Sequence, residues 1–310
     1  MHNDIDPSSG SLIHTEEEQQ PLETMKARVP FEQFFLAALA QTVAVFAAFW
    51  LIAPGVLRSE GIRPWRILPW TLAMGVPLSL FEYLYHRYLL HSAVLPFMSA
   101  MQRAHGNHHG LTDVRAPVRA HDPEKLATVT SEFPVEEKHQ EESMMFPLWS
   151  GLIFVFVFTV LLGLPVKLLA PTQPVYTSLI CAVMLYYCGY EVWHAFLHLP
   201  FEKFWEPRMH RSSVRRVYGF HLMHHWRPTA NLAIVGLWGV AVWDHLFRTH
   251  HRPERMPLDQ ALVNYHDGSF GKPRWPISML DGWQGGLART SRRFEGFLAA
   301  VFLGRRQSRK

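Results

Sequence analysis

The chain has 310 residues, of which 48% are hydrophobic and 13% aromatic, yet its mean hydropathy is only −0.02. This mixture is typical of a membrane protein with a substantial polar part. The net charge is a mild +4 and the arginines are spread along the chain, which favours a membrane surface and argues against a nucleic-acid partner. Cys181 and Cys188 lie in an apolar stretch and are interpreted as buried side chains rather than a disulfide.

Four hydrophobic runs are long enough to cross a bilayer core of about 30 Å at a rise of about 1.5 Å per residue. They cover residues 31–53, 67–85, 146–169 and 175–193. We therefore predict an all-α fold, an integral membrane helical bundle of about four transmembrane helices. The apolar stretch Leu232–Trp243 is too short to span and is predicted to be a re-entrant or interfacial helix.

Polar segments flank and separate these runs. Residues 1–28 are acidic, lack the marks of a signal peptide and are predicted to be a disordered tail. In the polar loop 92–145, the acidic section 136–142 is interpreted as a solvated surface helix, and His121 and His139 are interpreted in the same way. Residues 252–310 form a C-terminal tail whose basic end is typical of an amphipathic segment resting on lipid, or of a plain solvated helix.

Ten of the 19 histidines fall into four clusters at the spacings of metal ligands. The clusters are His86 and His91; His105, His108 and His109; His194 and His198; and His221, His224 and His225. Residues three or four apart share a helical face, so the members of the last three clusters can point together. His86 and His91 are five apart, about 140° around an ideal helix, and are expected to converge only where the helix ends or bends.

These clusters indicate a metal site. One His-x-x-His-His is often an ordinary polar helix surface, but four clusters in one chain are not explained in that way. Imidazole suits zinc, copper, iron and nickel, and ten imidazoles favour a two-metal site over one four-coordinate zinc.

The runs and the clusters also predict a common topology. Runs 67–85 and 175–193 lead directly into His86 and His194, so all ten clustered histidines are expected in a cap on one face of the membrane. Basic residues after the last run place this histidine-rich helical cap in the cytosol by the positive-inside rule. Arg58, Arg63 and Arg66, in the loop on the opposite side of the membrane, argue against this orientation. A bacterial inner membrane and an endoplasmic reticulum would give the same pattern.

The order of the clusters resembles that of the fatty acid hydroxylase superfamily, membrane di-iron oxygenases that include sterol methyl oxidases, desaturase-like enzymes and sphingolipid hydroxylases. The segments His86–His91, His105–His109 and Trp243–Phe247 are similar to the fatty acid 2-hydroxylase branch. The resemblance runs from about Phe31 to His250. It implies a membrane-embedded catalytic domain over residues 29–251, in which two iron ions, bound by the ten histidines, use O2 to hydroxylate an unactivated C–H bond of a membrane lipid or fatty acyl chain.

Carboxylates that hydrogen-bond to metal-bound imidazoles usually fix their tautomer. Candidates are Asp244, to which the resemblance adds weight, and Glu82 and Glu191, for which a helix-end charge is an equally good explanation. An apolar cleft for the lipid chain could be lined by aromatic side chains, although these more often pack helices or sit at the interface. The candidates are Phe81, Tyr85, Tyr187 and Trp193.

The sequence contains no source of electrons. It has no dinucleotide-binding glycine motif, no cysteine set for an iron–sulfur cluster and no stretch that resembles a haem-binding domain. An oxygenase of this kind therefore needs a separate donor, either a cytochrome b5-like protein or a ferredoxin with its reductase.

Other functions remain open. A lipid or sterol desaturase would use the same di-iron site, and the cluster spacings favour a hydroxylase over it. The segment His108–Asp113 matches an acyltransferase motif, but such a motif leaves nine clustered histidines unexplained. A zinc-dependent membrane hydrolase would want a general base such as the Glu of His-Glu-x-x-His, which does not occur, and a transporter would hold its ligands near the membrane midplane. Zinc also outranks ferrous iron in affinity, so it can replace iron in a purified sample.

Overall fold

The computed structural model describes residues 31–112, 114–115, 128–129, 144–199, 201–251 and 271–307. These residues are helical except for loops and a single two-residue antiparallel pair, β1 (Val114–Arg115) with β2 (Thr128–Val129). The predictions for residues 1–28, for the acidic section 136–142 and for His121 and His139 lie outside the described residues.

Within the described residues, four helical segments are long and apolar enough to cross a membrane, as the hydrophobic runs predict. The first is α1 (Phe31–Ile52). The second, Pro64–Leu90, joins η1 (Pro64–Arg66), α3 (Ile67–Tyr85) and the π-helical turn η2 (His86–Leu90). The third, Ser150–Leu169, joins α6 (Ser150–Phe158), η3 (Thr159–Gly163) and α7 (Leu164–Leu169), and the fourth is α8 (Val175–Leu197).

The outer faces of these helices carry exposed apolar side chains, including Leu51 at 80% and Leu169 at 86% exposure. Water would not favour so much exposed apolar surface, but a lipid environment accommodates it. The bundle is thus consistent with an integral membrane protein. Its core packs mainly between α3 and α8, where Leu78, Leu179 and Val183 are buried.

One end of the bundle is closed by α2 (Pro54–Gly61), which packs against the start of α8. The buried Glu60 carboxylate accepts hydrogen bonds from the backbone N–H groups of Tyr176 and Thr177, at 3.1 and 2.8 Å. These are N–H groups of the first turn of α8, which have no partner within the helix. Lys167 pairs with the same carboxylate at 2.7 Å, so the charge of Glu60 is balanced where it caps α8.

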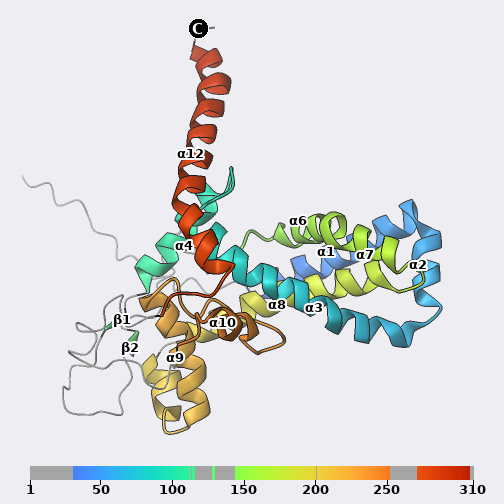
Figure 1. The fold of residues 1–310 in the computed structure, drawn as a ribbon. Coiled ribbons are helices and arrows are strands. Elements are labelled where there is room, and N and C mark those ends of the chain that lie inside the picture. The colour runs from blue at the N-terminus through green and yellow to red at the C-terminus, as the bar shows by residue number, and fades with distance from the viewer. Residues whose placement is uncertain are drawn as a thin grey trace, which may run out of the picture.

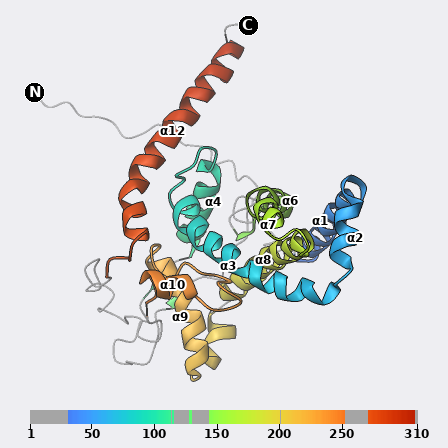
Figure 2. The same cartoon turned by 45° about the vertical axis from the view of Figure 1, so that its right-hand side comes forward.

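The cap helices gather at the other end, away from α2, in both views (Figures 1 and 2). They are α4 (Ser99–Leu111), η4 (Phe201–Trp205), η5 (Glu206–Arg208), α9 (Ser212–Trp226) and α10 (Val242–Phe247). The histidine-rich part of the chain therefore lies at one end of the four apolar helices, as the sequence predicts.

The predicted helix over Leu232–Trp243 is wrong. Residues 227–241 form a loop with positive φ at Asn231 and Trp238, and only the end of the stretch joins α10. Carboxylates accept hydrogen bonds from the backbone N–H groups of residues 232–236, which a helix would have used internally. A buried loop is stable here because its polar backbone is satisfied by distant side chains.

The C-terminal helix α12 (Ile277–Gln307) starts beside η2 and projects away from the end of the bundle (Figures 1 and 2). Asp281 of α12 accepts hydrogen bonds from the Arg87 guanidinium at 2.9 and 2.7 Å and from the Tyr88 hydroxyl at 2.9 Å. Further along, Glu295 accepts a hydrogen bond from the Ser99 hydroxyl at 2.6 Å. The helix is therefore anchored beside the first histidine cluster, and its contact with lipid stays a prediction.

Candidate metal centre

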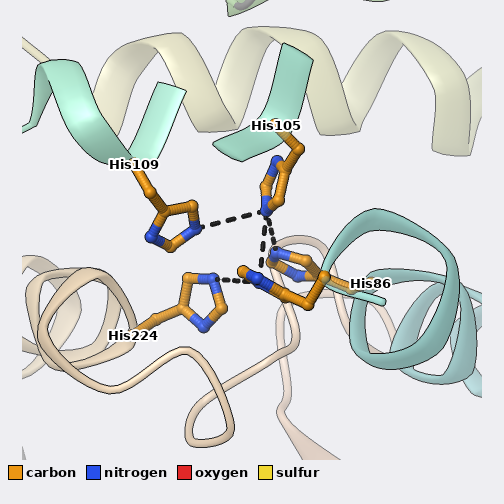
Figure 3. A group of neighbouring side chains, drawn as sticks. His86, His105, His109 and His224 are labelled. Carbon is orange, nitrogen blue, oxygen red and sulfur yellow. Dashed lines mark hydrogen bonds between the residues drawn. The ribbon is translucent and has the colours of Figure 1, made fainter. Parts of the chain in front are cut away.

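All ten clustered histidines converge, and they do so in two groups of five. The first group is His86, His91, His105, His109 and His224. The second group is His108, His194, His198, His221 and His225. Within each group the ligand atoms all lie within 4.8 Å of one another. Figure 3 shows four imidazoles of the first group turned toward a common point.

Helices α4 and α9 each supply ligands to both groups, so they hold the two groups side by side. Helix α4 gives His105 and His109, spaced four apart, to the first group and His108 to the second. Helix α9 does the reverse, with His224 in the first group, while α3 with η2 and α8 complete one group each. The expectation that His105, His108 and His109 point together is thus refined: they share a helical face but divide between two sites.

The π-helical turn η2 explains how His86 and His91 come together. A π-helix closes hydrogen bonds between residues five apart, so it brings positions i and i+5 nearer to one face than an α-helix does. The two imidazole rings stack at a centroid distance of 5.2 Å and an interplanar angle of 19°. The expected change in the helix between these residues is confirmed.

The nitrogen positions fit the coordination shell of a metal ion. Two nitrogen ligands at about 2.1 Å from one metal lie about 3.0 Å apart when they subtend about 90°, and about 4.2 Å apart when they lie opposite. Neighbouring Nε2 atoms within the two groups are 2.9 to 3.3 Å apart. Five imidazoles per group exceed the four ligands of a structural zinc site and suit a metal of higher coordination number.

Backbone carbonyls orient two of these imidazoles. His86 donates from Nδ1 to the Leu232 carbonyl at 2.6 Å, and His224 donates from Nδ1 to the Ala230 carbonyl at 2.9 Å. A proton on Nδ1 leaves the Nε2 lone pair free to face the centre of the group. The loop that follows α9 therefore fixes the tautomer of ligands in the first group.

Two of the three candidate carboxylates, Asp244 and Glu82, hydrogen-bond to the backbone of this loop. Asp244 accepts hydrogen bonds from the backbone N–H groups of Leu232 and Ala233, at 2.9 and 3.0 Å, and from the Thr249 hydroxyl at 2.7 Å. Glu82 likewise accepts from the N–H groups of residues 234–236. Asp244 and Glu82, candidates for direct contact with an imidazole, instead position the loop whose carbonyls accept from His86 and His224. The sequence gives no signal for the carbonyls, because every residue has one.

The surroundings of both groups lower the pKa values of several of their histidines. Loss of hydration lowers the pKa of His109 and of His198 to about 3. Burial, together with neighbouring imidazoles, holds the pKa values of His108, His221 and His225 well below their ordinary range. The imidazoles are therefore neutral at physiological pH, the form that binds metal.

A cavity of about 590 Å³ adjoins both groups through His105 and His194. Its walls are mainly apolar, and they include Leu90, Met101, Met145 and Leu148. A smaller apolar cavity of about 70 Å³ lies among α3, α6 and α8 and shares Phe146 and Tyr190 with the larger one.

Three of the four aromatic side chains proposed for a lipid cleft, Phe81, Tyr85 and Tyr187, line the small cavity. The fourth, Trp193, lines neither of these two cavities and is 40% exposed.

No family model matches the chain, and neither a curated protein nor a solved structure shows significant similarity to it. The resemblance of the histidine clusters to the fatty acid hydroxylase superfamily therefore stays a prediction.

Proposed function

We propose that this chain is an integral membrane di-iron oxygenase that hydroxylates an unactivated C–H bond of a membrane lipid or fatty acyl chain. The observation that carries the proposal is the pair of adjacent five-histidine groups next to an apolar cavity. Two bound iron ions would supply the activation of O2, with two electrons and two protons from outside reducing its second oxygen atom to water. The electrons come from a separate donor, a cytochrome b5-like protein or a ferredoxin with its reductase.

The chain's own residues have three tasks in this function. The histidines hold the metals, and the loop carbonyls of Ala230 and Leu232 keep ligand nitrogens turned inward. The cavity walls exclude water and admit an apolar chain. The cavity extends from His105 to Trp149, which is 61% exposed, so a chain can reach the metal centre from the lipid that surrounds the bundle.

The position of the histidines supports an enzyme over a transporter. His86 lies near the end of the Pro64–Leu90 segment and His194 near the end of α8, whereas transport sites sit near the membrane midplane. We place this end of the bundle on the cytoplasmic side, because Lys203, Arg208 and Arg211 follow α8.

A zinc-dependent membrane hydrolase is a second candidate, and one observation favours it. Glu191 lines the same cavity as His105 and His194, where a hydrolase would need a general base. A desaturase remains an alternative within the oxygenase proposal, since it needs the same metals and the same cavity.

The test is the metal content of the full chain, purified from membranes after expression with excess iron. About two irons per chain, oxygen uptake with an added electron donor and a hydroxylated lipid product support the proposal. A desaturated lipid product would instead support the desaturase alternative. Zinc alone, with oxygen-independent hydrolysis and no oxygen uptake with any donor after iron loading, would overturn the proposal.

A further inference from the structure

The cavity beside the metal centre contains one carboxyl group among apolar walls. Glu191 of α8 is 1% exposed and precedes His194 by three residues, close to one helical turn. The side chain therefore lies on the same side of α8 as a metal-ligand candidate and lines the cavity with it. Carboxyl groups are rarely buried without partners, so this one needs an explanation.

Only one of the two carboxyl oxygens of Glu191 has a partner among the described residues. Oε1 accepts a hydrogen bond from the Phe146 backbone N–H at 2.9 Å. Oε2 is buried, and the described part of the chain offers it no hydrogen-bond partner. A buried polar atom without a partner is costly, and at a cavity wall a ligand can remove that cost.

The other walls define the rest of the ligand. Leu90, Met101 and Met145 surround the space, and Phe97 at its edge is 68% exposed. An apolar chain would pack favourably against these side chains, but a hydrocarbon alone would leave Oε2 of Glu191 without a hydrogen-bond partner. A free carboxylate would add a second acceptor beside it. A hydroxyl or amide group fits instead, because it offers a donor to an ionised carboxyl and an acceptor to a protonated one.

We propose that the free carboxyl oxygen of Glu191 binds a hydroxyl or amide group of a lipid whose chain occupies this cavity, and so positions that chain beside His105 and His194. The inference rests on the proposed function and narrows its substrate to neutral lipids with a hydrogen-bonding group, such as long-chain alcohols or amides. Glu191 is a positioning residue here, because its carboxyl group is held by the Phe146 amide and would act on the reaction by holding the lipid.

The experiment measures binding to the metal-loaded full chain in detergent. A radiolabelled long-chain alcohol is displaced by the unlabelled alcohol, and by the primary amide, the carboxylate and the alkane of equal chain length. The wild type is expected to bind the alcohol and the amide roughly tenfold more tightly than the alkane or the carboxylate. The variants are Glu191→Leu, which removes both oxygens, and Glu191→Gln, which keeps the shape and an acceptor for the Phe146 N–H.

Glu191→Leu is expected to abolish the preference for alcohol and amide over alkane, and Glu191→Gln to retain part of it. Glu206→Leu, at an exposed glutamate outside the cavity, is the matched control and is expected to leave the preference unchanged. Metal content, measured on each variant, shows whether the site has folded, and Glu191→Gln tests the inference if the leucine variant does not fold.

A wild type without preference for the alcohol or amide overturns the inference, and so does a preference that persists in Glu191→Leu. Since binding is measured without turnover, failure of the oxygenase proposal would appear separately, as the wrong metal or the absence of oxygen uptake.

Discussion

His108 and His109 are adjacent in the sequence, yet they belong to different metal-ligand groups. Their rings are 5.7 Å apart and nearly perpendicular, at 87°. Consecutive residues on a helix point about 100° apart, so the two rings leave α4 in different directions and each enters a different group. This pair therefore joins the two sites through a single peptide bond.

Single substitutions at this pair should separate the two sites. We expect His108→Ala and His109→Ala each to weaken metal binding at one group and spare the other, so that each variant keeps about one ion per chain under limiting metal. The measurement is metal content after equilibration at several iron concentrations. His210→Ala, at an exposed histidine outside both groups, should retain the wild-type content. Loss of both ions in each single variant would show that the sites do not form independently.

Much of this centre can be predicted from sequence because its signals are local. Long apolar runs identify the four candidate spans, and histidines at helical spacing identify all ten members of the two groups. The division of His105, His108 and His109 between groups depends on where α3, α8 and α9 lie around α4, which no local pattern records. The apolar run after α9 predicts a helix where the structure has a loop, because the carboxylates that bind the loop backbone, Glu82 and Asp244, lie at other positions in the sequence.

Asp244 is predicted to support both stability and metal binding through the loop. Asp244→Ala leaves the buried N–H groups of Leu232 and Ala233 without their acceptor, which should cost about 3 kcal/mol or more in the free energy of unfolding. Because the Leu232 carbonyl orients His86, iron affinity should also fall by about 10–100-fold. Denaturant unfolding and metal titration measure the two effects.

Thr249→Val provides a graded comparison for Asp244. It removes one of the three hydrogen bonds that the described residues make to the carboxylate, together with the contact of the Thr249 hydroxyl with the Tyr83 hydroxyl at 3.2 Å, so its effect on stability should be about 1 to 2 kcal/mol. An Asp244→Ala variant with wild-type iron affinity would contradict the link between the loop and the metal centre.

Acid should destabilise the metal-free protein. In the folded chain the pKa of His109 and of His198 is about 3, whereas in the unfolded chain it is about 6.5. Between these values the unfolded state binds more protons, so the free energy of unfolding falls as pH falls. Each of the two histidines contributes a slope of up to about 1.4 kcal/mol per pH unit. This stability is fully present above the unfolded pKa and starts to be lost as pH drops through about 6.5.

The measurement is chemical denaturation of metal-free protein from pH 7.5 to pH 5. Bound metal should raise stability at neutral pH and be released on acidification, since protons compete for the same nitrogens. Stability that stays level over this range would show that the imidazoles take up protons equally in the folded and unfolded chain, and stability that rises would show that the folded chain binds protons more readily.

The ion pair between Arg87 and Asp281 is predicted to hold α12 against the metal centre. Arg87 is 4% exposed and directly follows His86, and its guanidinium also donates to the Thr229 carbonyl at 2.7 Å. Asp281→Ala leaves a buried cation without its carboxylate, which should cost about 3 kcal/mol. Limited proteolysis should then cut at the start of α12 much faster than in the wild type. Asp281→Glu, which keeps the charge, should restore part of the protection.

Detachment of α12 should also weaken iron binding at the metal centre. Arg87 lies in the π-helical turn that brings His86 to His91, and Thr229 lies in the loop that carries the carbonyls facing His86 and His224. Arg87 therefore connects α12 to both supports of the first histidine group. We expect Asp281→Ala to weaken iron binding at this group several-fold and to leave the second group, whose ligands come from α4, α8 with His198, and α9, close to wild type. Equal loss of iron affinity at both groups would mean that Asp281→Ala acts on the whole cap. Unchanged iron affinity at both groups would show that α12 is attached beside the metal centre without supporting it.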